Sequence, residues 1–542
     1  MRKQTKLVAV LSAAALLAIG ASMTSMAAQG WQQEGDDWYY YDNNGDYVTD
    51  EWKKSGNNWY YLGDDGYMMK NYLLEDGDNV FYLDGNGVMV TNAWVAVAPD
   101  EDDYEDDAPE HYWYYFQSTG RAIKASGTNA IKKKDINGKT YGFDEDGRML
   151  YGFVDDSGDR LTDEDPFEDA LYYFGDSDDG AMTKGWLQYM DGSSLKEDYE
   201  DLNEMWFYFN PSTGKKVTGE GEANNVKTKN VNGKKYAFDE NGVMISSWDD
   251  VSTSSSNQKY YNAETDGHLA KKTWIWAVPS AEIDESDNDE DNYRWFYAGS
   301  NGETYKSEKK KINGKWYVFD PVGRMKAGLV IIDDDNTYND VVSTDDTTGD
   351  MLIAGNYASD DSDHGKADGT IDSTEGLYYF GDEATDGSMK TGKSIKIELQ
   401  DDVYTFGFAK DGKGYNKLES NKIYMNGVLI QADSDYKYQT VFNVAAQGDI
   451  DTGDKDDDKQ AILAETEAKT GIVEEDASST DFVSGAKYAN YVVGTSGTVI
   501  KPGKYVKDAD DNYYAVNKSG DIAFFPSSDE AKDGAQAWAK QE

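Results

Sequence analysis

The chain has 542 residues and no cysteine, and its 103 acidic against 52 basic residues give a formal charge of −51. The absence of cysteine excludes a disulfide framework and a thiol nucleophile. The acidic excess argues against nucleic acid as a partner, because that binding depends on Lys and Arg neutralising phosphates. Cationic ligands, neutral sugars and bridging divalent ions are compatible with this acidic excess. Aromatic residues make up 13% of the chain, a content untypical of disordered proteins.

The first 27 residues have the pattern of a secretory signal peptide. Arg2, Lys3 and Lys6 precede an apolar run over residues 7–19, and small residues at 25–27 form a cleavage site. No later segment approaches the roughly 18 consecutive apolar residues that suggest a membrane-spanning helix. The sequence therefore predicts a secreted protein without a membrane span, from which residues 1–27 are removed.

A short phrase recurs at a fixed spacing after this segment. Its copies are Trp38-Tyr-Tyr-Tyr-Asp-Asn-Asn-Gly45, Trp59-Tyr-Tyr-Leu-Gly-Asp-Asp-Gly66 and Val80-Phe-Tyr-Leu-Asp-Gly-Asn-Gly87. Each aromatic run predicts a strand, and each Asx/Gly cluster predicts a tight turn. One hairpin cannot bury its own apolar face, so neighbouring hairpins must stack. Residues 28–93 are thus predicted as three short repeats of an all-β solenoid of stacked β-hairpins.

A longer phrase recurs at residues 135–147, 230–242 and 311–323, each time after a Trp-containing hairpin. The spacing predicts three long units of several hairpins each within residues 94–430. The predicted starts of these units are Trp94, Trp186 and Trp274.

Each long unit carries an acidic insertion, at residues 100–110, 194–204 and 282–291. We interpret these insertions as solvated loops between hairpin strands. The third unit has a longer polar insertion, residues 333–375, whose apolar residues 351–353 favour a small extra hairpin.

The repeat pattern fades after residue 430. Residues 431–483 are predicted to be a polar linker with a short helix at 459–469, and residues 484–542 to be degenerate repeats closed by a helical cap at 528–540. Residues 454–465 place acids as an EF-hand loop does, but Lys459 stands where that loop requires Gly. The pattern therefore favours a solvated acidic helix start over a metal site.

In the run from Trp38 to Tyr41, strand alternation puts Trp38 and Tyr40 on one face and Tyr39 and Tyr41 on the other. One aromatic face can build the core between hairpins. The other must lie against a neighbouring turn of the stack or be offered to a ligand.

The passages Trp52-Lys-Lys-Ser-Gly-Asn-Asn-Trp59-Tyr-Tyr-Leu-Gly-Asp-Asp-Gly66-Tyr-Met68 and Gly180-Ala-Met-Thr-Lys-Gly-Trp186 resemble the cell-wall-binding repeat family. That family includes choline-binding repeats, the glucan-binding repeats of glucosyltransferases and the repeats of clostridial toxins. The resemblance covers roughly residues 30–430 and, more faintly, 484–526. It implies a β-solenoid, and in choline-binding members a cage of aromatic rings, two from one hairpin and another from the next. For sugars, the resemblance implies that the same rings stack on the pyranose.

In the family, one cage Trp precedes the aromatic strand. By position, the resemblance implies that this role falls to Trp52, Trp94, Trp186, Trp248 and Trp274. It assigns the Trp that opens the strand to Trp38, Trp59, Trp113, Trp206, Trp295 and Trp316. The best cages are expected between Trp52, Trp59 and Tyr82 and around Trp186 and Trp206. For any single Trp, a role in the core is an equal alternative. Phe153 and Leu329 replace the Trp, so a full set of cages is not expected.

No catalytic constellation is evident, and no cofactor or metal is predicted. His111, His268 and His364 lie in polar or turn contexts without metal-ligand spacing, which predicts simple exposure. The sequence favours a secreted, non-enzymatic protein of the Gram-positive cell surface that binds a cell-wall polymer, through teichoic-acid choline or polysaccharide. An extracellular carbohydrate-binding module or adhesin, directed at glucans or host glycans, is the alternative. A third interpretation is a structural spacer without a ligand.

Overall fold

The computed structural model describes residues 29–99, 109–127, 130–162, 165–189, 199, 202, 204–222, 225–249, 258–263, 265–360, 369–382, 386–443, 461–464 and 491–542. The predicted signal peptide lies outside these residues. The chain forms two compact units, one of residues 1–247 and 261–269 and one of residues 248–260 and 270–542. Among the described residues, no helix combines the length and the apolar character needed to cross a membrane.

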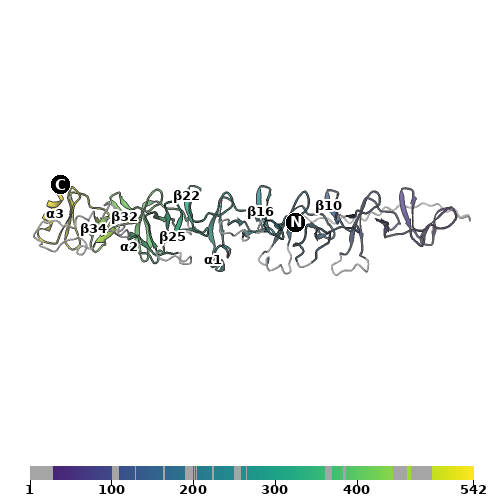
Figure 1. Ribbon diagram of the computed structural model, residues 1–542, viewed down its shortest axis with the longest axis horizontal. Helices are drawn as coiled ribbons and strands as arrows, with labels where there is room; N and C mark the ends of the chain where they lie inside the picture. Colours follow the sequence, from purple (N-terminus) through teal and green to yellow (C-terminus); the bar gives the residue numbers. More distant parts are fainter. Residues whose placement is uncertain are drawn as a thin grey trace. The chain divides into compact units, whose positions relative to one another are not determined.

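The first unit is a series of two-stranded antiparallel sheets, each made of consecutive strands joined as a hairpin (Figure 1). The paired strands are β1 (Gly30–Glu34) with β2 (Asp37–Tyr41), β3 (Glu51–Ser55) with β4 (Asn58–Leu62), β5 (Tyr72–Asp76) with β6 (Asn79–Leu83), β7 (Ala93–Val97) with β8 (Tyr112–Phe116), β9 (Lys132–Ile136) with β10 (Lys139–Phe143), β11 (Gly152–Val154) with β12 (Tyr172–Phe174), β13 (Gly185–Tyr189) with β14 (Met205–Phe209), and β15 (Lys227–Val231) with β16 (Lys234–Phe238). The division between the units falls within β17 (Ser247–Trp248) and β18 (Tyr260–Tyr261).

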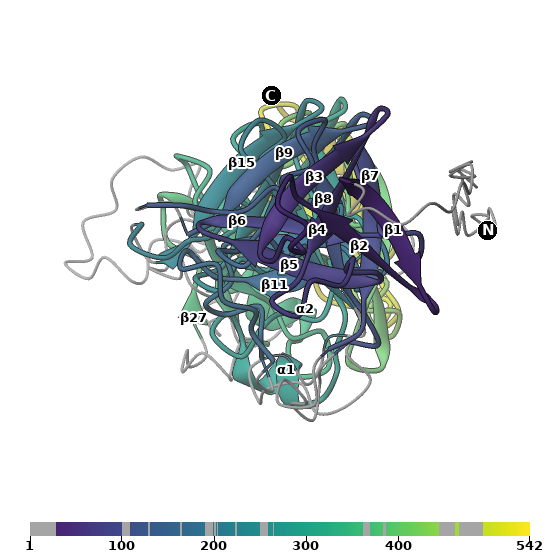
Figure 2. The same ribbon diagram turned by 90° about the vertical axis from the view of Figure 1, so that its right-hand side faces the viewer.

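Consecutive hairpins of the first unit are joined by a recurring backbone hydrogen bond. The residue two places after a turn glycine donates its N–H to the carbonyl of the second strand of the preceding hairpin. Met68 donates to Trp38 over 2.8 Å, and Met244 donates to Trp206 over 2.8 Å. In Figure 2, β1 and β7 of this unit lie on one side and β3, β9 and β15 on another, so hairpins three apart return to the same side.

At several of these joints a methionine side chain lies under the turn glycine of the next hairpin. A Cβ atom on Gly87 would lie 2.9 Å from Met68 Sδ, and one on Gly214 would overlap Met182 Sδ and Cε. Gly214 also has a φ of +73°, in the left-handed region that favours glycine. Each turn glycine of this kind therefore serves both the turn and the contact between hairpins.

We expect Gly214→Ala to lower the free energy of unfolding by about 1–3 kcal/mol more than Gly233→Ala. Both glycines have positive φ, but nothing lies within 4 Å of a Cβ on Gly233, whereas Met182 is in the way at Gly214. The additional loss is that of overpacking a filled site. Urea denaturation of the two variants measures it, and equal losses would show that Met182 moves aside without cost.

The second unit begins with a hairpin of the same kind, formed by β19 and β20, and continues with larger sheets. Its elements are β19 (Thr273–Ala277), α1 (Glu285–Asp289), β20 (Arg294–Ala298), β21 (Glu308–Ile312), β22 (Lys315–Phe319), β23 (Met325–Lys326), β24 (Leu329–Asp333), β25 (Tyr338–Val341), α2 (Gly349–Ile353), β26 (Asn356–Tyr357), β27 (Gly369–Thr370), β28 (Glu375–Tyr379), β29 (Gly392–Leu399), β30 (Asp402–Phe408), β31 (Lys417–Glu419), β32 (Lys422–Met425), β33 (Val428–Leu429), β34 (Tyr438–Asn443), β35 (Ala461–Ala464), β36 (Tyr491–Gly494), β37 (Lys504–Lys507), β38 (Tyr513–Val516), β39 (Ile522–Phe525) and α3 (Ala531–Ala539). The larger sheets have the strand orders β21-β22-β23, β25-β24-β28, β29-β30-β33-β32-β31, β35-β34-β36 and β37-β38-β39.

The expected all-β solenoid of hairpins with a short C-terminal helix is confirmed, and α3 supplies that helix. Four local expectations need correction. Residues 285–289 of the third acidic insertion form α1 rather than a loop, and residues 351–353 lie in α2 rather than in a hairpin. Residues 461–464 are a strand rather than part of a helix. Residues 438–443, assigned to a polar linker, form β34 in a three-stranded sheet.

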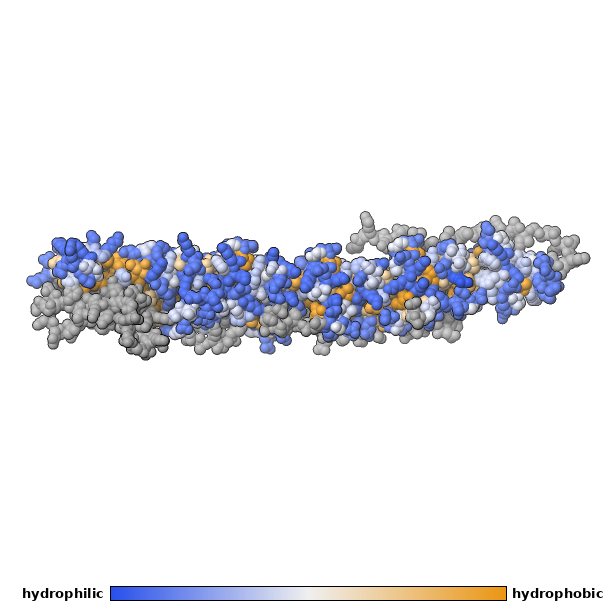
Figure 3. All heavy atoms as spheres, turned by 45° about the horizontal axis from the view of Figure 1, so that its top comes forward, coloured by the Kyte–Doolittle hydropathy of each residue, from blue (hydrophilic) through white to orange (hydrophobic). Residues whose placement is uncertain are grey.

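In the first unit the core is divided into small clusters at the contacts between hairpins, because a hairpin buries its apolar face only against its neighbours. In the second unit the larger sheets share an extended cluster, which includes Leu329, Phe406 and Val493. Phe116, Phe143 and Phe238 are fully buried in three different clusters of the first unit. On the face shown in Figure 3, hydrophobic residues appear as separate patches among hydrophilic ones.

Candidate binding sites: aromatic cages between hairpins

Three positions recur where one hairpin meets the next. The first wall is the second residue of a hairpin's first strand, and the second wall is the second residue of its second strand. The third wall comes from the second strand of the following hairpin. Trp186, Trp206 and Tyr236 show the arrangement, from β13, β14 and β16. Strand alternation fixes which side chains can reach a joint, so the same three positions recur at several joints.

Four joints carry Trp at the first and second walls and Tyr at the third, and we call these the aromatic cages. They are Trp31/Trp38/Tyr60, Trp94/Trp113/Tyr141, Trp186/Trp206/Tyr236 and Trp274/Trp295/Tyr317. In chain order, the ring centroids of first and third walls lie 5.2, 4.8, 4.7 and 4.8 Å apart, with planes inclined by 67°, 66°, 68° and 72°. The ring geometry is thus nearly constant along the chain.

In two of the cages the two Trp walls meet at nearly a right angle. The rings of Trp186 and Trp206 lie 6.3 Å apart and are inclined by 82°, and those of Trp274 and Trp295 lie 6.0 Å apart and are inclined by 86°. All four indoles are half-buried. The rings therefore form a corner that keeps part of its aromatic surface accessible to solvent.

The cages are built from neutral rings. Burial and the nearby Asp179 raise the pKa of Tyr141, and burial and Asp386 do the same for Tyr317. Both phenols therefore stay protonated at physiological pH. Trp206 Nε1 donates to Glu204 Oε2 over 3.2 Å, which turns the polar edge of this indole to a carboxylate. Within the described part of the chain, Trp31 Nε1 and Trp113 Nε1 are buried without a hydrogen-bond partner.

The structure separates two of the residues expected to share a cage. Trp52 packs on Phe81 at 5.0 Å and 65°, so Phe81 takes the third wall. Tyr82 packs in a different cluster, with Phe116 at 6.2 Å. Trp59 is 39% exposed. The expected Trp52/Trp59/Tyr82 grouping therefore needs correction: its third ring is a Phe one residue earlier in the strand.

Sequence reasoning missed the third walls and the first Trp of the chain. The missed residues are Trp31, Tyr60, Tyr141, Tyr236 and Tyr317. Each Tyr directly follows the repeat position at which the Trp of the second strand stands, so counting one residue beyond that position would have found them. The other expected residues, Trp94, Trp113, Trp186, Trp206, Trp274 and Trp295, fall in pairs into three cages, while Trp316 faces a lysine.

The histidines do not form a metal centre in the described part of the chain, which holds no group of three or more His, Asp or Glu suited to an ion. The side chain of His111 is 42% exposed and lies 3.8 Å from Glu110. The His268 side chain is only 28% exposed and lies 2.8 Å from Asp266, so the expectation of a simply exposed histidine needs correction there. His364 lies outside the described residues, as do residues 454–460 and 465 of the EF-hand-like stretch.

Two family models match the N-terminal repeats: a choline-binding repeat over residues 48–94 and a putative cell wall binding repeat over residues 29–47. The chain is also 27% identical over 222 residues to Glucosyltransferase-S of Streptococcus mutans. That match covers 41% of this chain and 11% of the relative, so the chain spans about a tenth of the relative's length.

Among solved structures, the chain is similar to CbpJ and to the modular autolysin LytC, both of Streptococcus pneumoniae. CbpJ is 16% identical, with 71% of this chain and 100% of that chain covered and a TM-score of 0.33. LytC is 17% identical, with 62% of each chain covered and a TM-score of 0.31. The two family models together match residues 29–94, so the N-terminal hairpins are similar to choline-binding and cell-wall-binding repeats.

Proposed function

We propose that this protein is a secreted, non-catalytic protein that attaches non-covalently to the Gram-positive cell wall. Its aromatic cages would hold quaternary ammonium groups, such as choline on a wall polymer. The observation that carries the proposal is the recurring corner of three neutral rings, seen most completely at Trp186, Trp206 and Tyr236. The match of a choline-binding repeat model to residues 48–94 supports the same ligand class.

The chemistry of the corner suits a soft cation. Each aromatic face attracts a quaternary ammonium group with roughly 0.5–2 kcal/mol, more when the group is desolvated. A right-angled arrangement lets one cation contact several faces at once. The charge of −51 adds a long-range attraction for cations, which is screened by salt.

Several weak sites on one chain give firm attachment to a polymer that presents the ligand repeatedly. In the first unit, β1 and β7 carry the first walls of two cages and lie on one side (Figure 2). A single polymer strand could then engage neighbouring cages without winding around the unit.

Choline titration followed by tryptophan fluorescence tests the ligand. We expect a saturable change in the intact protein, and Trp206→Ala to lose about a quarter of it, since one of four similar cages is removed. Trp538→Ala is the control, because Trp538 lies in α3 away from the cages. An unchanged choline response in Trp206→Ala would contradict the proposal. Co-sedimentation with sacculi, with and without wall teichoic acid, tests the target.

A second candidate function, sugar binding, is favoured by one exposed platform. Trp276 and Tyr293 are 49% and 52% exposed and stack at 5.8 Å with planes inclined by 28°. Trp295 continues this surface, 4.9 Å from Trp276. Such a broad face suits the apolar side of a pyranose. Retention on immobilised dextran that persists in choline, and that Trp276→Ala removes, would support this function.

A further inference from the structure

Two joints between hairpins carry a lysine where the cages carry their first Trp. Lys309 in β21 pairs with Val318, and Lys133 in β9 pairs with Gly142. This is the register of Trp274, which pairs with Tyr297. Both lysines therefore stand at the first wall, and their side chains enter the space that the next hairpin closes.

The ammonium group of Lys309 lies against the two remaining walls of its joint. Its Nζ atom is 4.2 Å from the ring centroid of Tyr378, the third wall, and 5.5 Å from that of Trp316, the second wall. Both distances are within the range of a cation–π contact. Lys309 is only 8% exposed. Within the described residues, Lys309 Nζ has no recorded hydrogen bond or ion pair.

Lys133 repeats the contact at a joint with fewer rings. Its Nζ atom lies 3.5 Å from the ring centroid of Tyr172, the third wall, and donates a hydrogen bond to the Thr213 carbonyl over 3.2 Å. The second wall here is Thr140, which offers no aromatic face. Burial lowers the pKa of Lys133 to about 8 and also lowers the pKa of Lys309.

We propose that Lys309 and Lys133 are built-in occupants, whose ammonium groups fill the cation position of their joints and close these joints to external quaternary ammonium ligands. The residue at the first wall, Trp or Lys, then determines whether a joint is a binding site or an internal contact. The inference rests on the proposed function for its ligand and deepens it by naming the joints that do not bind. It also identifies a latent site, because Trp316 and Tyr378 remain when the amine is removed.

The latent site can be tested one indole at a time in the full chain labelled with 5-fluorotryptophan. Fluorine NMR resolves the tryptophans, and Phe variants assign the resonances of Trp206, Trp295 and Trp316. We expect choline to shift Trp206 and Trp295 in the unmodified protein while Trp316 stays in place. In Lys309→Ala, Trp316 should shift saturably with choline. In Lys309→Met, which removes the charge but keeps the bulk, it should stay in place.

The outcomes separate this inference from the proposed function. A shift of Trp316 in the unmodified protein, or its absence in folded Lys309→Ala, would overturn the inference. A shift of Trp316 in Lys309→Ala with silent Trp206 and Trp295 would support the inference and refute the proposed function, and silence of every indole would refute both. Lys309→Ser is the second variant if Lys309→Ala does not fold, and the unmodified protein alone can still overturn the inference.

Discussion

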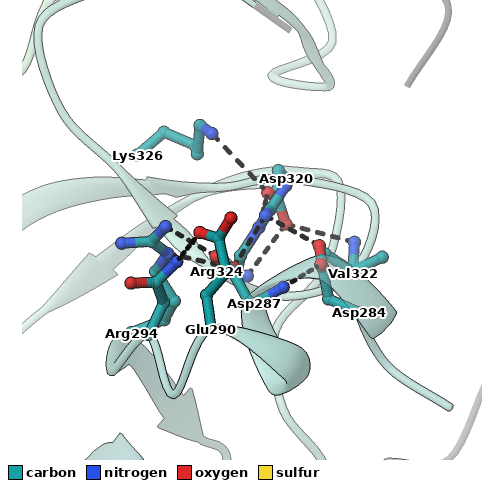
Figure 4. Close-up of polar contacts among 9 residues, drawn as sticks. Asp284, Asp287, Glu290, Arg294, Asp320, Val322, Arg324 and Lys326 are labelled. Carbon is teal, nitrogen blue, oxygen red and sulfur yellow. Dashed lines mark hydrogen bonds and ion pairs between the residues drawn. The ribbon is translucent and has the colours of Figure 1, made fainter. Parts of the chain in front are cut away.

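Replacement of Arg324 by Met will lower the free energy of unfolding at pH 7 by about 3–5 kcal/mol, the usual cost of breaking a buried ion pair from one side. The Arg324 guanidinium donates to Asp320 over 2.7 Å, to Asp284 over 2.8 Å and to Asp287 over 2.9 Å. Its side chain is 10% exposed, and the three carboxylates are buried more deeply. Figure 4 shows them converging on the arginine from α1 and from the turn after β22. Without it, buried negative charges face one another.

The loss should shrink on acidification. Burial alone would raise the pKa of Asp287, but the hydrogen bonds and charges of Arg294 and Arg324 hold it below its ordinary value. Ionised Asp287 therefore stabilises the native protein above the unfolded pKa, and this contribution is lost as pH falls through the lower folded pKa. In Arg324→Met, Asp287 keeps only Arg294 as a cationic partner, so its pKa should rise and its protonation should relieve the variant more than the unmodified protein.

Urea denaturation at pH 7 and at pH 4.5 measures both effects. Lys326→Met is the matched control, because Lys326 Nζ lies 3.9 Å from Asp320 Oδ2 and makes no hydrogen bond to it. The control should cost about 1 kcal/mol or less. A difference between Arg324→Met and the unmodified protein that is the same at both pH values would show that the network does not depend on ionised carboxylates.

Replacing all four second-wall tryptophans by Ala will weaken retention on cell walls by about 10²–10⁴-fold, whereas each single replacement will weaken it only slightly. The four residues are Trp38, Trp113, Trp206 and Trp295. Linked weak sites multiply their contributions, so the whole set carries the attachment and no member is indispensable. Co-sedimentation with sacculi over a range of protein concentrations gives the apparent affinity of each variant.

The matched control removes four tryptophans outside the cages: Trp59, Trp248, Trp316 and Trp538. It should bind walls like the unmodified protein while losing the same number of indoles. Circular dichroism establishes that both fourfold variants keep their strands. Equal loss of retention in the two variants would show that the aromatic content, rather than the cage geometry, holds the wall.

The repeated phrase was sufficient to predict hairpins, turns and stacking, because each of these depends on residues close together in the chain. The cages needed one further step, the identity of the third wall. Trp59 and Tyr60 are adjacent and lie on opposite faces of β4, so a shift by one residue selects the wrong neighbour. Expecting Tyr82 instead of Phe81 was an error of this kind, and it moved the third wall to a different cluster.

Interactions between distant parts of the chain were harder to predict. The acidic stretch at 282–291 looks like a solvated loop on its own. Two of its carboxylates, Asp284 and Asp287, are buried because Arg324 approaches from a distant part of the chain and Arg294 also pairs with Asp287. The lysines at the first walls look like ordinary strand residues until Tyr172 and Tyr378 lie beside them. Residues 351–353 lie in a helix whose first turn is capped by Thr348, because the Thr348 side chain accepts a hydrogen bond from the Met351 amide. In the sequence, this capping residue is a weaker signal than the apolar run that follows it.

The joint between hairpins makes this chain easy to lengthen in evolution. It consists of one backbone hydrogen bond and a turn glycine that faces a residue of the preceding hairpin, a methionine at several joints, and neither part depends on which hairpin supplies it. A duplicated hairpin therefore arrives with both halves of the connection it needs. Added length between strands β24 and β28 is tolerated for the same reason, since β24 still pairs with β28 across the inserted residues. New walls can then diverge one residue at a time, which lets gene duplication change the number of ligand sites separately from the stability of the stack.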